Sequence, residues 1–502
     1  MRLLSTIESL GGIDADNDDL LIKCFQNHDA YKKVLALNKF IILGRKGTGK
    51  TAIFKKILKD RDYNTFSFGH TFSDYPWHYH DKQVKLGVPD FDKYTHSWKY
   101  LIYLTISKIL LNQDASIPFD DSSLEYLGKI ERFIVDTYGT RDPDLTQIFT
   151  PSKLLKIKPN FSVDLGVFKG QFSAEHFPME HLPVIVQEVN TNLSEYVISS
   201  LNPANRYYIL FDQLDLGFDP ANKDYNNRLI GLLLAARDIN NIAKEKGKNL
   251  GVIVFLRDDI YNKLKFEDKN KLTVGYSTTI EWDSRGSLTL KDLIDSRLTE
   301  VLGENGEKVQ WDDIFDETQL MTGKQSKYSY IIDRTFLRPR DMIQFCNEII
   351  TQHNKVLSAR KIENGEIYNA KFEYSRYFLK ELDDEVHKHL PVYEAVLEVI
   401  KGIGYYQFDM ETFRRALKEK SFLFSEEQNP ISTMKSLFEF SIIGYYRAGG
   451  SGFGGSEYVF RYRDLNAIFD ENAKLFRVHP GLIETLSLKR STSQTTEDDA
   501  DQ

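Results

Sequence analysis

The sequence predicts an α/β fold in which helices cover both faces of a parallel β-sheet. Three short apolar runs, at 40–43, 207–211 and 251–256, are continuous in the way that strands buried on both faces are. Helix-forming segments follow the first run from Thr51 onward and occupy 229–237, between the other two. Strands that alternate with helices indicate a parallel sheet, and such sheets place functional residues at the carboxyl ends of their strands.

Length and composition bound the classes of protein that fit. A chain of 502 residues predicts two or three domains, and 27% charged with 41% hydrophobic residues is ordinary for a globular protein. No run approaches the roughly 18 apolar residues that a membrane span requires, and early acidic residues argue against a signal peptide, so we expect a cytoplasmic protein without membrane contact. Two cysteines exclude a disulfide framework. The net charge of −8 argues against a surface devoted to nucleic acid, but permits a local basic patch.

The first strand ends in a glycine-rich loop with the pattern G-x-x-x-x-G-K-[ST]. Glycines allow backbone N–H groups to approach phosphate oxygens closely, and the helix that follows has an N-terminus that favours anions. The lysine of this pattern reaches the terminal phosphates and the final hydroxyl binds magnesium. The sequence therefore predicts a site for ATP and Mg²⁺ formed by Gly44, Arg45, Lys46, Gly47, Thr48, Gly49, Lys50 and Thr51.

The second strand ends in acidic residues that complement this loop. We predict that Asp212 holds the magnesium shell together with Thr51, although an N-cap role is the alternative. Many P-loop ATPases have a glutamate directly after this aspartate, but Gln213 here cannot accept a proton. Asp215 is the candidate catalytic base in its place, with an ordinary loop carboxylate as the alternative, so hydrolysis could be slow.

Four arginines are candidates for sensing the nucleotide. Arg257 ends the third strand, where it could contact the terminal phosphate or form an ion pair with a neighbouring aspartate. Arg338 and Arg340 flank a proline at a predicted helix start, from which a guanidinium could reach the nucleotide. Arg297 is a weaker candidate for an arginine finger offered to a neighbouring subunit, with a structural salt bridge as the alternative.

The last hundred residues predict a winged-helix domain, in which three helices precede a hairpin with a glycine-rich tip. The helices are expected at 392–403, 410–420 and 431–440, and the strands at 442–447 and 457–463. Arg447, Arg461 and Arg463 alternate with aromatic residues, as a wing that contacts a DNA backbone would require. Basic and acidic residues are balanced at 13 each over 391–490, so a wing that packs against protein is the alternative.

These segments predict the domain organisation. A P-loop core is expected at 1–290, with a small antiparallel elaboration at about 140–185, and a helical lid at 291–390. The winged helix would occupy 391–490, and 491–502 reads as a disordered acidic tail because it has no apolar residues to bury.

The motifs together resemble the AAA+ and STAND-type ATPases of the origin-recognition-like branch, and more narrowly bacterial P-loop ATPases with the same loop sequence. The segments that carry this resemblance are the loop 44–51, the box 212–215, the strand end 256–259, the helix start 338–341 and the winged helix. The resemblance spans roughly 10–488. It implies a nucleotide-binding core, a lid that carries a second sensor, oligomerisation, and a winged helix that in relatives binds DNA or packs on the lid. Such families often serve as regulatory or antiphage-defence ATPases.

Three functions are compatible with the sequence. The first is an ATP-gated or ATP-driven switch that recruits a protein partner or DNA. The second is a scaffold that binds ATP without hydrolysing it. A phosphotransferase is the third and weakest, because no acceptor motif is visible. The sequence contains no recognisable nuclease, protease or TIR effector site, so an effector would come from another chain.

Overall fold

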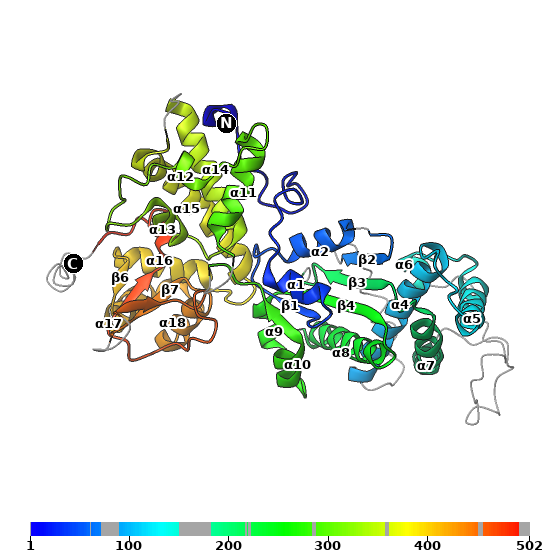
Figure 1. Ribbon diagram of the computed structural model, residues 1–502. Helices are drawn as coiled ribbons and strands as arrows, with labels where there is room; N and C mark the ends of the chain where they lie inside the picture. Colours follow the sequence, from blue (N-terminus) through cyan, green and yellow to red (C-terminus); the bar gives the residue numbers. More distant parts are fainter. Residues whose placement is uncertain are drawn as a thin grey trace. The chain divides into compact units, whose positions relative to one another are not determined.

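The computed structural model describes residues 2–60, 62–71, 90–149, 182–215, 218, 222–283, 288–356, 361–449 and 455–490, drawn in colour in Figure 1. The chain forms two compact units. The sheet unit comprises Asn27–Arg45 and Gly49–Ile280. The helical unit comprises Met1–Gln26, Lys46–Thr48 and Glu281–Gln502. The N-terminal segment thus groups with the C-terminal half of the chain.

The described part of the sheet unit contains a five-stranded sheet in which every neighbouring pair is parallel, in the order β2-β3-β4-β1-β5. The strands are β1 (Ile41–Leu43), β2 (Thr65–Thr71), β3 (Arg206–Asp212), β4 (Asn249–Leu256) and β5 (Ser277–Thr279). The predicted α/β class is therefore confirmed, as are the three predicted strands. The strands β2 and β5 are not among the predicted ones, because β2 mixes polar residues with apolar ones and β5 is only Ser-Thr-Thr.

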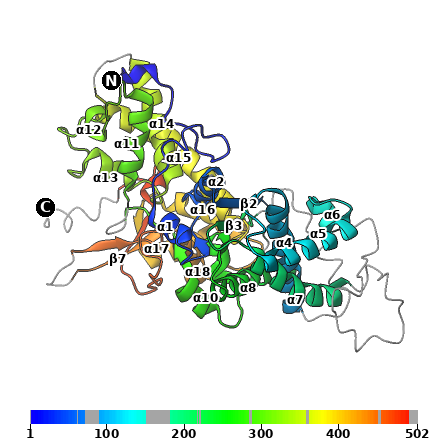
Figure 2. The ribbon, with the colours of Figure 1, turned by 45° about the vertical axis from the view of Figure 1, so that its right-hand side comes forward.

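Helices cover both faces of this sheet (Figures 1 and 2). On one face lies α2 (Lys50–Lys59), whose Phe54 ring meets Phe255 of β4 at 6.1 Å between centroids. On the other face lie α4 (Asp90–Asn112) and α8 (Lys223–Glu245). Trp98 of α4 packs edge-on against Phe211 of β3 at 5.7 Å. Burial on both faces explains why the central strands read as uninterrupted apolar runs.

The segment between β2 and β3 is helical where the structure describes it. After β2 come α4 and α5 (Asp121–Tyr138), and β2 itself lies between the first two predicted strands along the chain. Most of the elaboration predicted at about 140–185 lies outside the described residues. Its described parts are helical, in α6 (Leu145–Phe149) and the start of α7 (Leu182–Ser200). Shorter helices complete this unit: α1 (Asp29–Leu35), α9 (Asp258–Lys263) and α10 (Lys269–Tyr276).

The predicted lid region of the helical unit is helical. Its elements are α11 (Leu290–Leu302), α12 (Trp311–Ile314), α13 (Lys327–Ile332), α14 (Pro339–Val356) and α15 (Asn364–Val386). The N-terminal segment, which includes η1 (Leu4–Thr6), is tied to this group by side chains of α14. Asn347 hydrogen bonds to Leu10 N and Gly11 O at 2.8 and 3.0 Å, and Asn354 to Ile7 O at 2.9 Å.

The predicted three helices and hairpin of the last hundred residues are present. They are α16 (Tyr393–Ile403), α17 (Met410–Glu419), α18 (Pro430–Glu439), β7 (Ile443–Arg447) and β8 (Glu457–Val459). Two further strands, β6 (Gln407–Phe408) and β9 (Phe476–Val478), complete an antiparallel sheet in the order β6-β9-β7-β8, and the short turns η3 (Ser421–Leu423) and η4 (Pro480–Leu482) follow α17 and β9. The second strand of the hairpin was predicted to reach residue 463, but β8 ends at Val459. Arg461 and Arg463 therefore lie beyond the hairpin. The tip at 450–454 and the tail at 491–502 lie outside the described residues.

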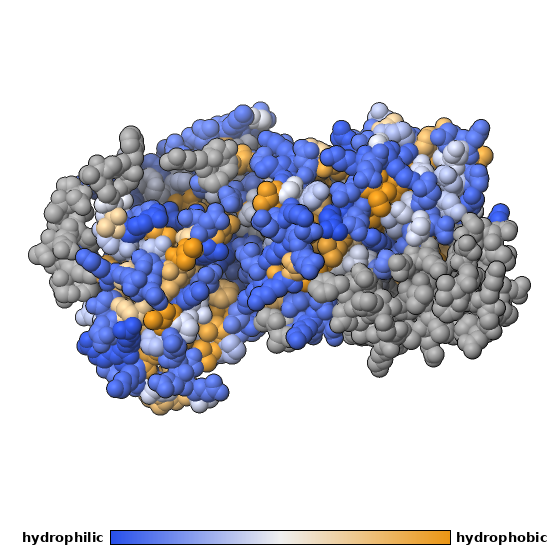
Figure 3. Space-filling model, turned by 90° about the horizontal axis from the view of Figure 1, so that it is seen from below, coloured by the Kyte–Doolittle hydropathy of each residue, from blue (hydrophilic) through white to orange (hydrophobic). Residues whose placement is uncertain are grey.

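The surface in Figure 3 is mainly hydrophilic where it is coloured, with apolar side chains in small groups. Within the described ranges, no helix combines the length and the apolar character that a membrane crossing requires.

Candidate nucleotide site

The glycine-rich loop connects β1 to α2, as the sequence predicted. Gly47 and Gly49 have φ angles of 82° and 107°, a left-handed conformation that side chains other than hydrogen rarely adopt. A Cβ atom at position 47 would also lie only 3.0 Å from Cβ of Arg340. The backbone of the loop therefore favours glycine both at position 49, which belongs to the pattern, and at position 47, which the pattern leaves open.

Lys50, the first residue of α2, folds back over the loop. Its ammonium group donates hydrogen bonds to the carbonyl oxygens of Gly44 and Arg45 at 2.7 and 2.8 Å. Burial lowers the pKa of Lys50, and the nearby carboxylates of Asp215 and Asp212 oppose that shift. The ammonium thus lies over the loop and faces two acidic residues at the end of β3.

Asp212 ends β3 and is only 2% exposed. Thr51 donates its hydroxyl and Gln213 its backbone N–H to this carboxylate, while burial, the largest influence, raises the pKa of Asp212. The second carboxylate oxygen, Oδ2, is buried and has no hydrogen-bond partner among the described residues. A buried carboxylate oxygen without a donor fits a cation, and oxygen ligands are those that Mg²⁺ prefers. The described residues contain no cluster of three or more His, Cys, Asp or Glu side chains suited to a metal, so phosphate and water oxygens would complete the shell.

Asp215 and Arg257 lie beside these groups in the sheet unit. Nη1 of Arg257 is 3.4 Å from Oδ2 of Asp215, and its other nitrogens hold Asp259 at 3.0 and 2.7 Å. The ion pair with a neighbouring aspartate, the alternative given for Arg257, is therefore present. Gln213 has a left-handed φ of 59° between the two aspartates. The structure thus brings together Lys50, Thr51 and three predicted residues at the ends of β3 and β4.

Arg338 lies in the helical unit and is 1% exposed. It donates to Asp341 at 2.9 Å, to the carbonyl oxygen of Lys46 at 2.8 Å, and to Glu385. The two carboxylates outweigh burial and raise the pKa of Arg338. Its side chain therefore acts as a buried structural cation that holds the backbone of the middle of the loop.

Arg340 and Lys46 are also paired with carboxylates of α15. Arg340 donates to Glu381 at 2.8 Å and to the carbonyl oxygen of Ile13 at 3.1 Å. Lys46 donates to Asp384 at 2.8 Å. The phosphate-contacting role predicted for Arg340 and for Lys46 stays a prediction.

Arg297 does not have the geometry of an arginine finger. Its side chain is 2% exposed and forms an ion pair with Asp18 at 2.5 Å, with a further hydrogen bond to Leu10 O at 2.6 Å. A finger must project from the surface, so the hypothesis is wrong and the salt-bridge alternative is correct. Sequence reasoning could not have found Asp18, because 279 positions separate the two residues.

The three arginines near the hairpin have carboxylate partners inside the helical unit. Arg447 pairs with Glu457, Arg461 with Glu439 at 3.6 Å, and Arg463 with Asp333 at 2.6 Å. These contacts favour the interpretation that the hairpin region packs against protein.

Thr71, which ends the unpredicted strand β2, is not among the predicted site residues. Thr71 lies opposite Asp212 in the parallel ladder, so β2 brings its carboxyl end to the candidate site. The alternation of Phe66, Phe68 and His70 with smaller residues was the one signal for this strand.

The parallel sheet, the loop between β1 and α2, and the buried aspartate at the end of β3 together define a P-loop α/β fold. Residues 288–383, which span α11 to most of α15, match the family model described as the FunZ-associated C-terminal helical domain. A relative in Escherichia coli (strain K12), described as "Putative transposon gamma-delta 80.3 kDa protein", is 24% identical over 437 residues. That match covers 80% of this chain and 55% of the relative, so the chain spans about half of the relative's length.

Two solved structures are similar over most of the chain. The Orc1 protein of Aeropyrum pernix in complex with DNA has a TM-score of 0.33 and 14% identity, with 85% of this chain and 86% of that chain covered. The Drosophila ORC bound to DNA has a TM-score of 0.26 and 9% identity, with 90% and 82% covered. At scores this far below 0.5, neither likeness establishes a shared family or function.

Proposed function

We propose that this chain binds ATP together with Mg²⁺ at the loop 44–51 and the end of β3, and hydrolyses the nucleotide slowly. The observation that carries this proposal is Oδ2 of Asp212, a buried carboxylate oxygen without a donor, on a side chain that already accepts from Thr51. A protein retains such a group when a ligand compensates the desolvation cost.

Each residue of the site has its own role in the proposed reaction. Lys50 exchanges the carbonyls of Gly44 and Arg45 for the terminal phosphates. Thr51 and Asp212 would hold Mg²⁺, which would neutralise charge on the transferred phosphoryl group. Asp215 accepts the proton of the attacking water, and Arg257 holds Asp215 in place.

The second candidate function is ATP binding without hydrolysis. Gln213 occupies the position at which many P-loop ATPases carry a glutamate, and Arg257 is shared between Asp215 and Asp259. Both facts favour a protein whose state depends on bound ATP more than on rapid hydrolysis. A non-hydrolysing, ATP-gated scaffold is therefore the alternative function.

The finer parts of the proposal rest on motif resemblance alone. They are a switch of AAA+ or STAND type that oligomerises in the cytoplasm, acts with a protein partner or effector chain, and serves in regulation or antiphage defence. DNA binding through the C-terminal hairpin is also proposed from resemblance, and the ion pairs of Arg447, Arg461 and Arg463 weigh against it.

The test is calorimetric titration of ATP into the purified protein, with Mg²⁺ and with EDTA. We expect magnesium-dependent binding that Lys50→Ala abolishes and that Lys59→Ala preserves, since Lys59 is an exposed lysine at the far end of the same helix. Equal binding by both variants would refute the assigned site. Phosphate release with and without double-stranded DNA then separates a switch that hydrolyses ATP from a scaffold that does not.

A further inference from the structure

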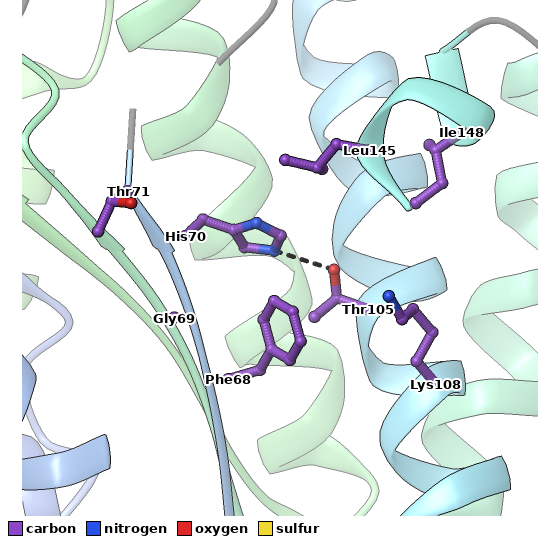
Figure 4. A pocket seen from close by; sticks show the side chains of 8 residues that line it. All are labelled: Phe68, Gly69, His70, Thr71, Thr105, Lys108, Leu145 and Ile148. Atoms are coloured by element: carbon purple, nitrogen blue, oxygen red, sulfur yellow. Dashed lines mark hydrogen bonds between the residues drawn. The ribbon is translucent and has the colours of Figure 1, made fainter. Parts of the chain in front are cut away.

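A cavity of 280 Å³ lies in the sheet unit between the end of β2 and helices α4 and α6 (Figure 4). Phe68, Leu145 and Ile148 form its apolar walls, and His70, Thr105 and Lys108 supply polar groups. Of the residues that line the cavity, Thr71 alone pairs with Asp212 of the nucleotide site. Because small-molecule sites usually enclose roughly 300–1,000 Å³, this cavity suits a ligand of one or two rings.

The hydrogen bonds around Thr105 determine which nitrogen of His70 carries the proton. The Thr105 hydroxyl donates its single proton to the carbonyl oxygen of Leu101, one helical turn back, at 2.9 Å. With the hydroxyl proton assigned to Leu101, we assign the histidine as donor in the 3.0 Å contact between His70 Nε2 and Thr105 Oγ1. Burial, with a smaller contribution from Lys108, lowers the pKa of His70 to about 3, so the ring is neutral at pH 7. Its Nδ1 is consequently an unprotonated acceptor.

This acceptor faces the cavity. In Figure 4 the second ring nitrogen of His70 lies on the side of the ring toward Leu145, away from the bond to Thr105. The side chain is 5% exposed, and the described residues offer Nδ1 no hydrogen-bond donor. Nδ1 is therefore open to a ligand in the cavity that brings an O–H or N–H group.

The charge of Lys108 is already compensated. Its ammonium group lies 2.6 Å from Oδ1 of Asp142 and donates to Pro143 O at 2.9 Å, and it stands 5.6 Å from the centre of the Phe68 ring. The cavity therefore favours a neutral ligand over an anion. The apolar walls favour an aromatic ring, because an aromatic ring can pack against Phe68 and the two aliphatic side chains.

We propose that this cavity binds a small, neutral aromatic molecule whose hydroxyl or N–H group donates a hydrogen bond to Nδ1 of His70. The neighbours of His70 suggest an effector site. His70 and Thr71 pair with Phe211 and Asp212 across the β2–β3 ladder, and the His70 ring stacks on Phe211 at 5.0 Å. Ligand binding here would thus act on the strand that carries the magnesium residue. The proposal goes beyond nucleotide binding and does not depend on it.

The test compares phenol with toluene, which has the same shape and lacks the donor, by NMR titration of the full chain. We expect phenol to bind about ten-fold more tightly, as one net hydrogen bond in a buried site gives. Equal affinities, or no phenol binding at millimolar concentrations, would overturn the proposal. This comparison uses the unmodified protein, so it does not depend on the folding of any variant.

Two variants then test whether phenol binds in this cavity. Ile148→Phe fills the cavity and should reduce phenol affinity at least ten-fold, whereas Leu124→Phe, at an exposed position of α5, should leave it unchanged. Equal loss in both would show that phenol binds elsewhere. Lys50→Ala should bind phenol as the unmodified chain does, so failure of the nucleotide site and failure of this site give different results.

Discussion

The hydroxyl of Thr51 hydrogen bonds to the carboxylate of Asp212, which joins the first turn of α2 to the end of β3. The bond satisfies one carboxylate oxygen and leaves Oδ2 buried without a partner. These two residues are 161 positions apart, and the sequence predicts both as magnesium ligands. Their contact is the geometric basis of the predictions on nucleotide binding.

Replacement of Asp212 by asparagine should stabilise the nucleotide-free protein and remove magnesium-dependent ATP binding. The substitution eliminates a buried charge whose second oxygen is unpaired, and it keeps an oxygen that can accept from Thr51. We expect a higher Tm in EDTA and no further rise with Mg²⁺ and ATP, measured by thermal melts. A lower Tm for Asp212→Asn in EDTA would contradict this account.

Substitution of Asp215 by alanine should lower phosphate release about 100-fold or more while ATP binding persists, because it removes the proposed general base and not a phosphate ligand. Asp224→Ala is the matched control, since Asp224 is an exposed aspartate at the start of α8. Turnover at the parental rate in Asp215→Ala would exclude the catalytic role.

Gly47→Ala should abolish ATP binding and destabilise the protein by about 1–2 kcal/mol, because position 47 has a left-handed φ of 82°. Gly128→Ala is the control within a helix. No atom would meet the added methyl within 4 Å, so this change should stabilise α5 by about 1 kcal/mol. Urea denaturation measures both effects, and equal behaviour of the two variants would argue against a strained loop.

Arg338→Met should destabilise the helical unit by about 3–5 kcal/mol, since it leaves Asp341 and Glu385 buried without their cation. Arg376→Met, at an exposed arginine of α15, should change stability by less than about 0.5 kcal/mol. Addition of Asp341→Asn and Glu385→Gln to Arg338→Met should recover part of the loss. No recovery in the triple variant would mean that packing, and not charge, holds this cluster.

His70 should make the sheet unit less stable as the pH falls. Burial lowers the pKa of His70 from 6.5 to about 3, so the unfolded chain binds a proton between these values and the folded chain does not. The resulting loss in the free energy of unfolding is negligible well above pH 6.5 and reaches about 2 kcal/mol at pH 5. Urea denaturation at pH 7.5 and 5 should show a loss that His70→Gln reduces and that His387→Gln, at an exposed histidine, does not. The same loss in all three proteins would assign it to other groups.

The fold class and the central residues of the candidate site were predictable from local patterns in the sequence. Continuous apolar runs identify strands buried on both faces, and each ends where its functional residue begins, in Gly44, Asp212 and Arg257. The loop pattern is local, because the φ angles of Gly47 and Gly49 and the start of α2 depend on neighbouring residues. Periodicity was also sufficient for α16, α17 and α18, whose apolar stripes are regular.

Strands and side chains whose neighbours come from distant parts of the chain could be assigned only from the three-dimensional structure. The three-residue strand β5 carries no apolar signal and exists because it pairs with β1. The structural role of Arg297 depends on its ion pair with Asp18, which is distant in the sequence. The positions of Arg461 and Arg463 relative to the hairpin depend on where β8 ends. The cavity beside His70 depends on α4 and α6 packing near β2. Local patterns record backbone conformation and burial, whereas pairing partners depend on contacts that no local pattern encodes.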